Sequence, residues 1–254
     1  MNWQSIRLGG LSLLALFALS CDQPPADCTT GHGGFAATYT LVSKQGTGAC
    51  DRLIGEVVGL EKYNPAQASD PKKQDLTKAK LRIRPTELSL RAAEAEEQGS
   101  AVESEALDSV GDFVSATPDE ANVCLVPSMT PASIAIALSA GQPATDRTYT
   151  WSNVKVYVTT AHPGTQMTAD LVYSEGECAA TYRVMALWPA VGCGVDADED
   201  GVEEGIDAAL CDPDADPAAG RATGSGINPD FEDRVECHPE LHLCVLREVP
   251  EGLQ

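Results

Sequence analysis

Apolar and polar residues alternate along most of the chain between Phe35 and about Trp188. Within residues 154–159, valines alternate with Lys, Tyr and Thr, which is typical of a strand with one buried face. The segments Met167–Tyr173 and Cys178–Trp188 flank a short loop that contains Gly176, so they predict a β-hairpin. The same pattern predicts further strands at Phe35–Val42, Leu53–Leu60 and Ile134–Leu138.

A helical period is nearly absent from this pattern. A short stretch near Arg91–Glu97 is the one helical candidate, and no segment keeps an amphipathic helical period over about twelve residues. Strands that follow one another with turns between them indicate an antiparallel sheet. We therefore expect a mainly β fold, with an antiparallel β-sandwich or barrel domain over residues 35–193.

The N-terminus carries a different pattern, a continuous apolar run over Leu8–Leu19 that follows Arg7. Twelve residues are too few to span a bilayer core of ~30 Å as a helix, so residues 1–20 are predicted to be a signal peptide. The run ends in Ala18-Leu19-Ser20-Cys21, which resembles a bacterial lipobox. This resemblance implies that Cys21 is lipidated, carries palmitate-type acyl chains and becomes the new N-terminus. The alternative is an ordinary signal peptide that leaves Cys21 free.

Residues 21–34 contain Pro, Thr and Gly and are predicted to be the lipidated tether. The whole chain is 43% hydrophobic, which favours a folded protein over disorder. Its net charge of −21 repels phosphate groups and therefore excludes nucleic-acid binding. Surface charge as a whole cannot hold the chain on an anionic membrane, so the expected membrane contact is the acyl anchor.

Nine cysteines are present, and setting Cys21 aside leaves an even number. An exported chain with eight further cysteines predicts disulfide bonds, although 105 pairings are possible. The pair expected first is Cys237–Cys244, because only six residues separate them. Zinc binding by these two cysteines with His238 and His242 is the alternative, but the four residues are crowded and oxidation would consume the thiolates. The disulfide candidates are Cys28, Cys50, Cys124, Cys178, Cys193, Cys211, Cys237 and Cys244.

Lys78, Lys80, Arg82 and Arg84 fall on one face of a further predicted strand. Such a basic stripe fits either a site for an anionic ligand or a solvated outer face protected by charge. The segment from about 94 to 120 has nine carboxylates and no basic residue, so it is predicted to be a long acidic loop that can fold back over the stripe. The structural interpretation is favoured.

After Cys193 the chain becomes rich in Asp, Pro and Gly, so residues 194–254 are predicted to form a small, loop-rich appendage held by disulfides. Within it, alternate acidic residues are followed by Gly201, a spacing typical of a loop that curls around calcium and offers hard oxygen ligands. The predicted ligands are Asp196, Asp198, Asp200, the Val202 carbonyl, Glu204 and Asp207.

This loop resembles the calcium loops of thrombospondin type 3 and dockerin repeats, a resemblance that implies a structural calcium ion of weak affinity. It departs from them in having Glu203 at the eighth position and in the late place of Cys211. The alternative is a solvated acidic loop. The closing segment, Gly224–Phe231 followed by Cys237 and Cys244, resembles the ends of uncharacterised lipoproteins of myxobacteria, which implies an envelope protein and no particular activity.

Known enzyme motifs are missing from the sequence, including GxSxG, HExxH and nucleotide-binding loops. The predicted β domain offers a single histidine, His162, for general-base chemistry. We therefore expect a lipid-anchored protein of the bacterial cell envelope that acts as a non-catalytic binding or scaffolding module, with a possible protein partner in the envelope. Two rival hypotheses are a carrier of small apolar ligands in a barrel cavity and an unrecognised hydrolase that uses His162.

Overall fold

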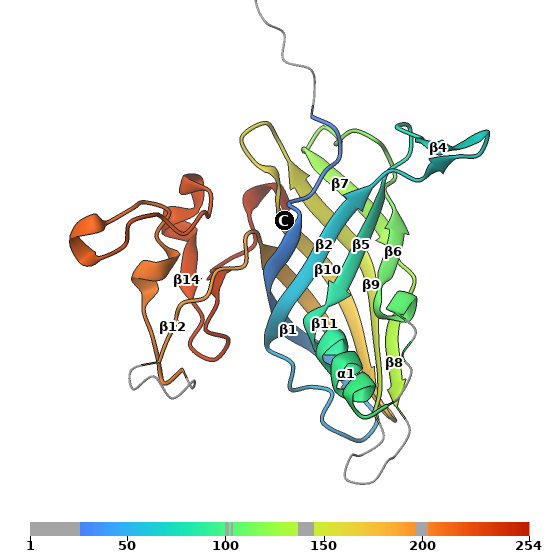
Figure 1. Cartoon of the computed structure of the whole chain (residues 1–254), viewed down its shortest axis with the longest axis horizontal. Helices are drawn as coiled ribbons and strands as arrows, with labels where there is room; N and C mark the ends of the chain where they lie inside the picture. Colours follow the sequence, from blue (N-terminus) through green and yellow to red (C-terminus); the bar gives the residue numbers. More distant parts are fainter. Residues whose placement is uncertain (1–25, 100–101, 103, 137–144, 197–202, 254) are drawn as a thin grey trace, which may run out of the picture.

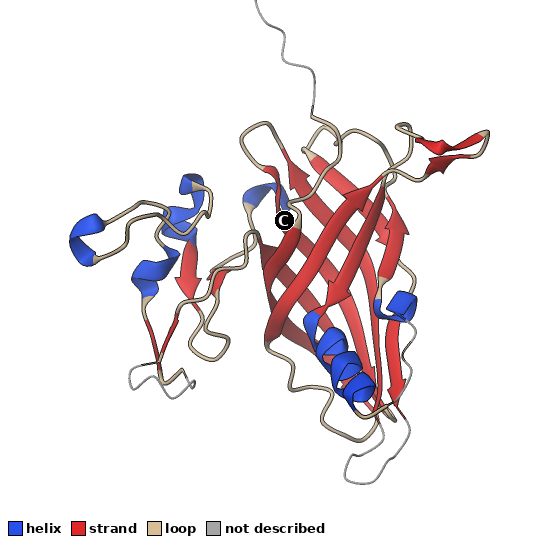
Figure 2. Cartoon of the chain, in the orientation of Figure 1, coloured by secondary structure: helices blue, strands red, loops and turns tan. Residues whose placement is uncertain are grey.

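The computed structural model describes residues 26–99, 102, 104–136, 145–196 and 203–253. It confirms a mainly β, antiparallel fold in which one sheet curls into a nearly closed barrel (Figure 1). Loops with short helices and strands form the C-terminal part beside the barrel (Figure 2). The predicted signal peptide and Cys21 lie outside the described residues.

All pairings within the barrel sheet are antiparallel, in the order β6-β5-β2-β1-β11-β10-β9-β7. The strands are β1 (Gly33–Gln45), β2 (Gly55–Tyr63), β5 (Lys80–Pro85), β6 (Ser109–Asp112), β7 (Val123–Ser128), β8 (Ala132–Ile136), β9 (Thr145–Val158), β10 (Pro163–Glu175) and β11 (Cys178–Leu187). β7 pairs with the second half of β9 and β8 with the first half. The two ends of the sheet meet where the Val114 amide donates to the Leu125 carbonyl, at 2.9 Å.

Alternate residues of each strand point into the barrel, as the period of two predicts. In β11, for example, Tyr182 and Val184 are buried while Arg183 between them is exposed. The interior is a single cluster of apolar side chains. Its largest fully buried members are Trp151, Tyr149, Tyr182, Phe35, Leu60, Leu81, Ile83, Leu88, Met167 and Leu171.

The predicted acidic loop at about 94–120 is wrong in part. Helix α1 (Thr86–Glu97) extends into it, and the 3₁₀ turn η1 (Ser104–Leu107) and strand β6 follow. Leu88, Ala92 and Ala95 form the buried stripe of α1, which contacts β2, β5 and β8. The helical candidate near Arg91–Glu97 coincides with the second half of this helix.

The predicted tether is also shorter than residues 21–34. Cys28 is bonded to Cys124 in β7, and its amide donates to the Ala116 carbonyl at 2.7 Å. β1 then begins at Gly33. The chain is therefore attached to the barrel from Cys28 onward, because a covalent cross-link removes the freedom that a tether needs.

The C-terminal part has a small apolar core of its own, formed around four cysteines with Ile227, Phe231, Val235 and Leu246. Its short elements are β12 (Gly194–Val195), β13 (Gly205–Ile206), η2 (Ala208–Cys211), η3 (Pro217–Ala219), η4 (Pro229–Arg234), β14 (Val235–Cys237), β15 (Cys244–Leu246) and η5 (Glu251–Leu253). Among the described residues, none of the helices has the length and apolar character needed to cross a membrane.

Candidate functional site

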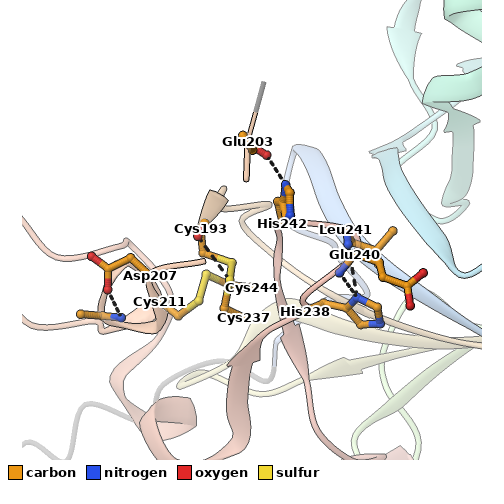
Figure 3. The surroundings of a disulfide bond; sticks show 11 residues. Cys193, Glu203, Asp207, Cys211, Cys237, His238, Glu240, Leu241, His242 and Cys244 are labelled. Carbon is orange, nitrogen blue, oxygen red and sulfur yellow. Dashed lines mark hydrogen bonds and ion pairs between the residues drawn. A yellow bond between two sulfur atoms is a disulfide. The ribbon is translucent and has the colours of Figure 1, made fainter. Parts of the chain in front are cut away.

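Two disulfides lie together in the C-terminal part (Figure 3). Cys193 pairs with Cys237 and Cys211 with Cys244, and the sulfurs of Cys193, Cys211 and Cys237 are all within 4.8 Å of one another. Cys50–Cys178 and Cys28–Cys124 complete the set, so the disulfides predicted from the even cysteine count are confirmed. The expected Cys237–Cys244 pair is wrong, because both side chains reach across to cysteines of other segments.

The alternative zinc site is disfavoured by the same disulfides, which leave no thiolate at Cys237 or Cys244. The two histidines also have separate partners (Figure 3). His238 Nδ1 accepts the backbone amides of Glu240 and Leu241, each at 3.3 Å, whereas His242 Nδ1 lies 2.6 Å from Glu203 Oε2.

The two ends of the predicted calcium loop are held side by side by β12 and β13. Val195 pairs with Gly205, and the Glu204 amide donates to the Val195 carbonyl at 3.1 Å. This ladder brings two of the predicted ligands, Asp196 and Glu204, to the same end of the hairpin. Asp198, Asp200 and Val202 lie outside the described residues.

Asp207 lies further from the loop. Its amide donates to the Cys193 carbonyl at 2.9 Å. Cys193 precedes Asp196 by three residues, which is roughly 10 Å along a strand. Its carboxylate accepts the Ala209 amide at 2.9 Å and so caps η2. The geometry therefore gives Asp207 a capping role and sets it apart from Asp196 and Glu204.

The second acidic run, at residues 212–216, binds an arginine of its own chain. Arg221 Nη2 lies 3.3 Å from Asp212 Oδ2 and 4.0 Å from Asp216 Oδ2. Both carboxylates also accept backbone amides in tight turns, from Asp214 and Ala218. An internal guanidinium thus neutralises part of the negative charge of this run.

Lys80, Arg82 and Arg84 of the basic stripe lie on the outer face of β5 and are neutralised within the chain, whereas Lys78 precedes the strand. The Asp108 carboxylate accepts hydrogen bonds from Arg82 Nη2 and Arg84 Nε, each at 2.5 Å, and from Arg84 Nη2 at 2.8 Å. Lys80 pairs with Asp112 at 2.6 Å. Both aspartates come from the predicted acidic segment, so the structural interpretation of the stripe is supported over an anion site.

A buried polar cluster that the sequence reading missed lies where α1 meets the barrel. Glu56 on β2 accepts the Tyr39 hydroxyl at 3.1 Å and the Glu87 amide at 2.9 Å. Arg147 on β9 forms ion pairs with Glu87 and with Glu175, the latter at 3.2 Å. We call these residues the Glu56 cluster.

Burial raises the pKa of Glu56, although the Glu87 amide acts in the opposite direction. The sequence does contain a signal for this cluster, because Glu56 has the same strand parity as the inward-facing Val58 and Leu60. The carboxylate serves the start of α1, where its oxygen accepts an otherwise unpaired amide. The cluster is therefore explained as a support for the helix.

His162 lies in the β9–β10 turn and contacts the C-terminal part. Asn228 Nδ2 donates to the Ala161 carbonyl at 2.8 Å and lies 3.1 Å from His162 Nδ1. His162 Nε2 lies 3.3 Å from Asp230 Oδ2, and the ring contacts Phe231. These contacts connect the two parts of the chain and favour a structural role over the general base of the hydrolase hypothesis.

The carrier hypothesis needs a large dry cavity inside the barrel. Ten large side chains, Trp151 and Tyr149 among them, instead occupy the interior as one packed cluster. A surface groove of about 610 Å³ lies on the outside of β9–β11 beside Val249 and Leu253 of the C-terminal segment. A packed interior therefore counts against the carrier hypothesis.

Comparison with known proteins gives two matches. The sequence model of the MlpA family matches residues 33–189, which is the barrel. A protein of Myxococcus xanthus with the name "Putative lipoprotein MlpA" is 26% identical over 246 residues, covering 94% of this chain and 89% of that protein. No solved structure matches the chain.

Proposed function

The chain belongs to the MlpA family, and we propose that it is a lipid-anchored protein of the bacterial cell envelope whose acyl groups are attached to Cys21. The observation that carries this proposal is the match along 94% of the chain to a protein named as a lipoprotein. Four disulfides agree with an oxidising compartment outside the cytosol. The lipobox-like Ala18–Cys21 supplies the attachment site.

Anchoring is tested by feeding cells radiolabelled palmitate and measuring the mass of the purified protein. The wild-type chain should incorporate label and begin at Cys21, while Cys21→Ala should remain unlabelled and leave the membrane fraction. Far-ultraviolet circular dichroism of both proteins controls for folding. An unlabelled wild-type chain with reduced thiols inside the cell would contradict the proposal.

We further propose that the anchored barrel works as a non-catalytic binding or scaffolding module for another envelope protein. Its support is a filled interior, together with a histidine already engaged by Asn228 and Asp230. The test is chemical cross-linking in intact cells followed by purification of the full chain. A specific cross-linked partner that persists in Cys21→Ala cells would separate binding from anchoring, and a failure to cross-link in either strain would contradict the module.

Calcium is the third part of the proposal, with Asp196, Asp198, Asp200, the Val202 carbonyl, Glu204 and Asp207 as candidate ligands. Its support is the donor set, which consists of the hard oxygens that calcium prefers, and the paired strands that bring Asp196 close to Glu204. The ion would neutralise clustered carboxylates. Since the Asp207 carboxylate already caps η2, we expect it to contribute least to calcium binding among these ligands.

Calorimetry with the full chain tests this site. We expect binding in the range of ~10⁻⁴–10⁻³ M and its loss in Asp198→Asn/Asp200→Asn. Asp214→Asn is the matched control, because it removes a carboxylate from the neighbouring acidic run, in which Asp212 and Asp216 pair with Arg221. Equal calcium heats in all three proteins would contradict the site.

A further inference from the structure

A lysine-bearing hairpin projects from the barrel at the end where the described chain begins. It consists of β3 (Ala66–Gln67) and β4 (Asp70–Gln74), and Figure 1 shows it at the same end as the first described residues. Cys28 is bonded to Cys124 at this end. The helix α1 lies at the opposite end (Figure 1).

The proposed anchor must lie near this end. Four residues lie between Cys21 and Ala26, so a fully extended chain spans at most ~18 Å from one to the other. The Cys28–Cys124 bond prevents the following residues from unwinding to extend the reach. A bilayer that holds Cys21 must therefore face the end of the barrel that carries the hairpin.

Lys72, Lys73, Leu76, Lys78 and Val114 form what we call the hairpin surface. Leu76 and Val114, with exposed fractions of 72% and 67%, are the two most exposed large apolar residues of the described chain. They belong to adjacent segments, since the Phe113 amide donates to the Ala79 carbonyl at 3.0 Å. This end of the barrel therefore offers two apolar side chains that are free to contact an apolar surface.

The charge that this surface presents outward is positive. Lys73 pairs with Asp70 at 3.5 Å and Lys78 with Asp75 at 3.4 Å, but the lysine side chains are 71% and 66% exposed against 39% and 21% for the aspartates. Lys72 is also exposed. The neighbouring loop carries Asp119 and Glu120, so the positive charge is confined to the hairpin side.

We propose that the hairpin surface contacts the headgroups of anionic phospholipids while Cys21 holds the chain in the bilayer. The lysines bind lipid phosphates, and Leu76 and Val114 enter the boundary between headgroups and acyl chains. Asp119 and Glu120 are repelled by the same phosphates, so the barrel leans toward the hairpin. This inference rests on the proposed lipidation of Cys21.

The test uses the full acylated chain in vesicles of phosphatidylglycerol and phosphatidylethanolamine. Leu76→Cys and Leu90→Cys are each labelled with an environment-sensitive fluorophore and quenched by spin-labelled lipids. Leu90 is the matched control, as a 55% exposed leucine on α1. The described cysteines are all in disulfides, and Cys21 has no free thiol once it is acylated. The fluorophore should therefore react with the introduced cysteine.

We expect quenching at position 76 several-fold stronger than at position 90. In the Leu76→Cys chain, Lys72→Gln/Lys73→Gln should weaken the contact by about fivefold for each lysine. Equal quenching at both positions, or a contact as strong on phosphatidylcholine vesicles, would overturn the inference. If the mass of the chain shows no acyl group, the proposed anchoring fails and the hairpin contact fails with it. If the chain is acylated but the quenching is equal at both positions, the hairpin contact alone fails.

Discussion

Cys237 faces Cys244 directly across the β14–β15 hairpin, yet the two are not bonded to each other. Each is bonded instead to a cysteine that precedes the hairpin, Cys193 or Cys211. The hairpin thus acts as the centre to which two distant loops are attached. Two cysteines that are close in sequence and opposite each other in a hairpin can therefore still form disulfides with other segments.

Peptide mapping under non-reducing conditions should recover Cys193 linked to Cys237 and Cys211 linked to Cys244. We expect no peptide that contains an internal Cys237–Cys244 bond, because those sulfurs are already used. Mass spectrometry before and after reduction makes the measurement. Recovery of the internal bond from freshly exported protein would contradict the observed connectivity.

Removing the N-terminal cross-link should destabilise the barrel strongly. The Cys28–Cys124 bond closes a segment with a sequence separation of 96, and loop entropy predicts a loss of ~4–5 kcal/mol in the double alanine variant. Urea unfolding followed by near-ultraviolet circular dichroism measures it. The Cys211–Cys244 double alanine variant is the comparison, and with a separation of 33 its loss should be smaller.

Replacing Asp108 by Asn should cost about 2 kcal/mol of folding free energy, because it leaves Arg82 and Arg84 without their shared, nearly buried carboxylate. Asp112→Asn is the control. It also loses an ion pair, to Lys80, but the carboxylate is 67% exposed, so the expected cost is below ~0.5 kcal/mol. Equal costs in thermal or urea unfolding would contradict a special role for Asp108.

Glu56 should make stability depend on pH in a defined direction. Its pKa is raised in the folded chain, mainly by burial, so the folded state holds the proton to a higher pH than the unfolded state does. Its contribution is constant below the ordinary pKa of 4.5 and falls as the pH rises from there through the folded pKa. Glu56→Gln cannot titrate, so its urea midpoint should fall less over this range.

The control for Glu56 is Glu61→Gln on the same strand, which alters one partner of Arg82 and leaves the buried cluster intact. This variant should keep the pH dependence of the wild-type chain. If Glu56→Gln also keeps it, then Glu56 is not the titrating group.

Asn228→Ala should loosen the C-terminal part from the barrel. The side chain donates to the Ala161 carbonyl, contacts His162, and accepts the Asp230 amide at the start of η4. Loss of these bonds should cost about 1–2 kcal/mol and raise cleavage by protease after residue 193. The barrel signal in circular dichroism should stay unchanged, and an unaltered cleavage rate would contradict the role of this contact.

The alternating pattern of residues 35–188 was sufficient to predict an antiparallel β fold, because a period of two leaves a strand one buried face. Eight cysteines beyond Cys21 were sufficient to predict disulfides for an exported chain. Even the neutral outer face of β5 could be anticipated, since Asp108 and Asp112 belong to a segment with no basic residue of its own.

Pairing over long separations was decided by the tertiary structure alone. Glu56 on β2 meets Tyr39 on the neighbouring β1 and Glu87 at the start of α1. Cys28, which precedes β1, meets Cys124 in β7, although β1 and β7 are not neighbours in the sheet. Both contacts depend on how the whole barrel packs. The sequence indicated only the second half of helix α1, as the candidate near Arg91–Glu97. Its apolar stripe of Leu88, Ala92 and Ala95 is thin and becomes stable only against the barrel that it contacts.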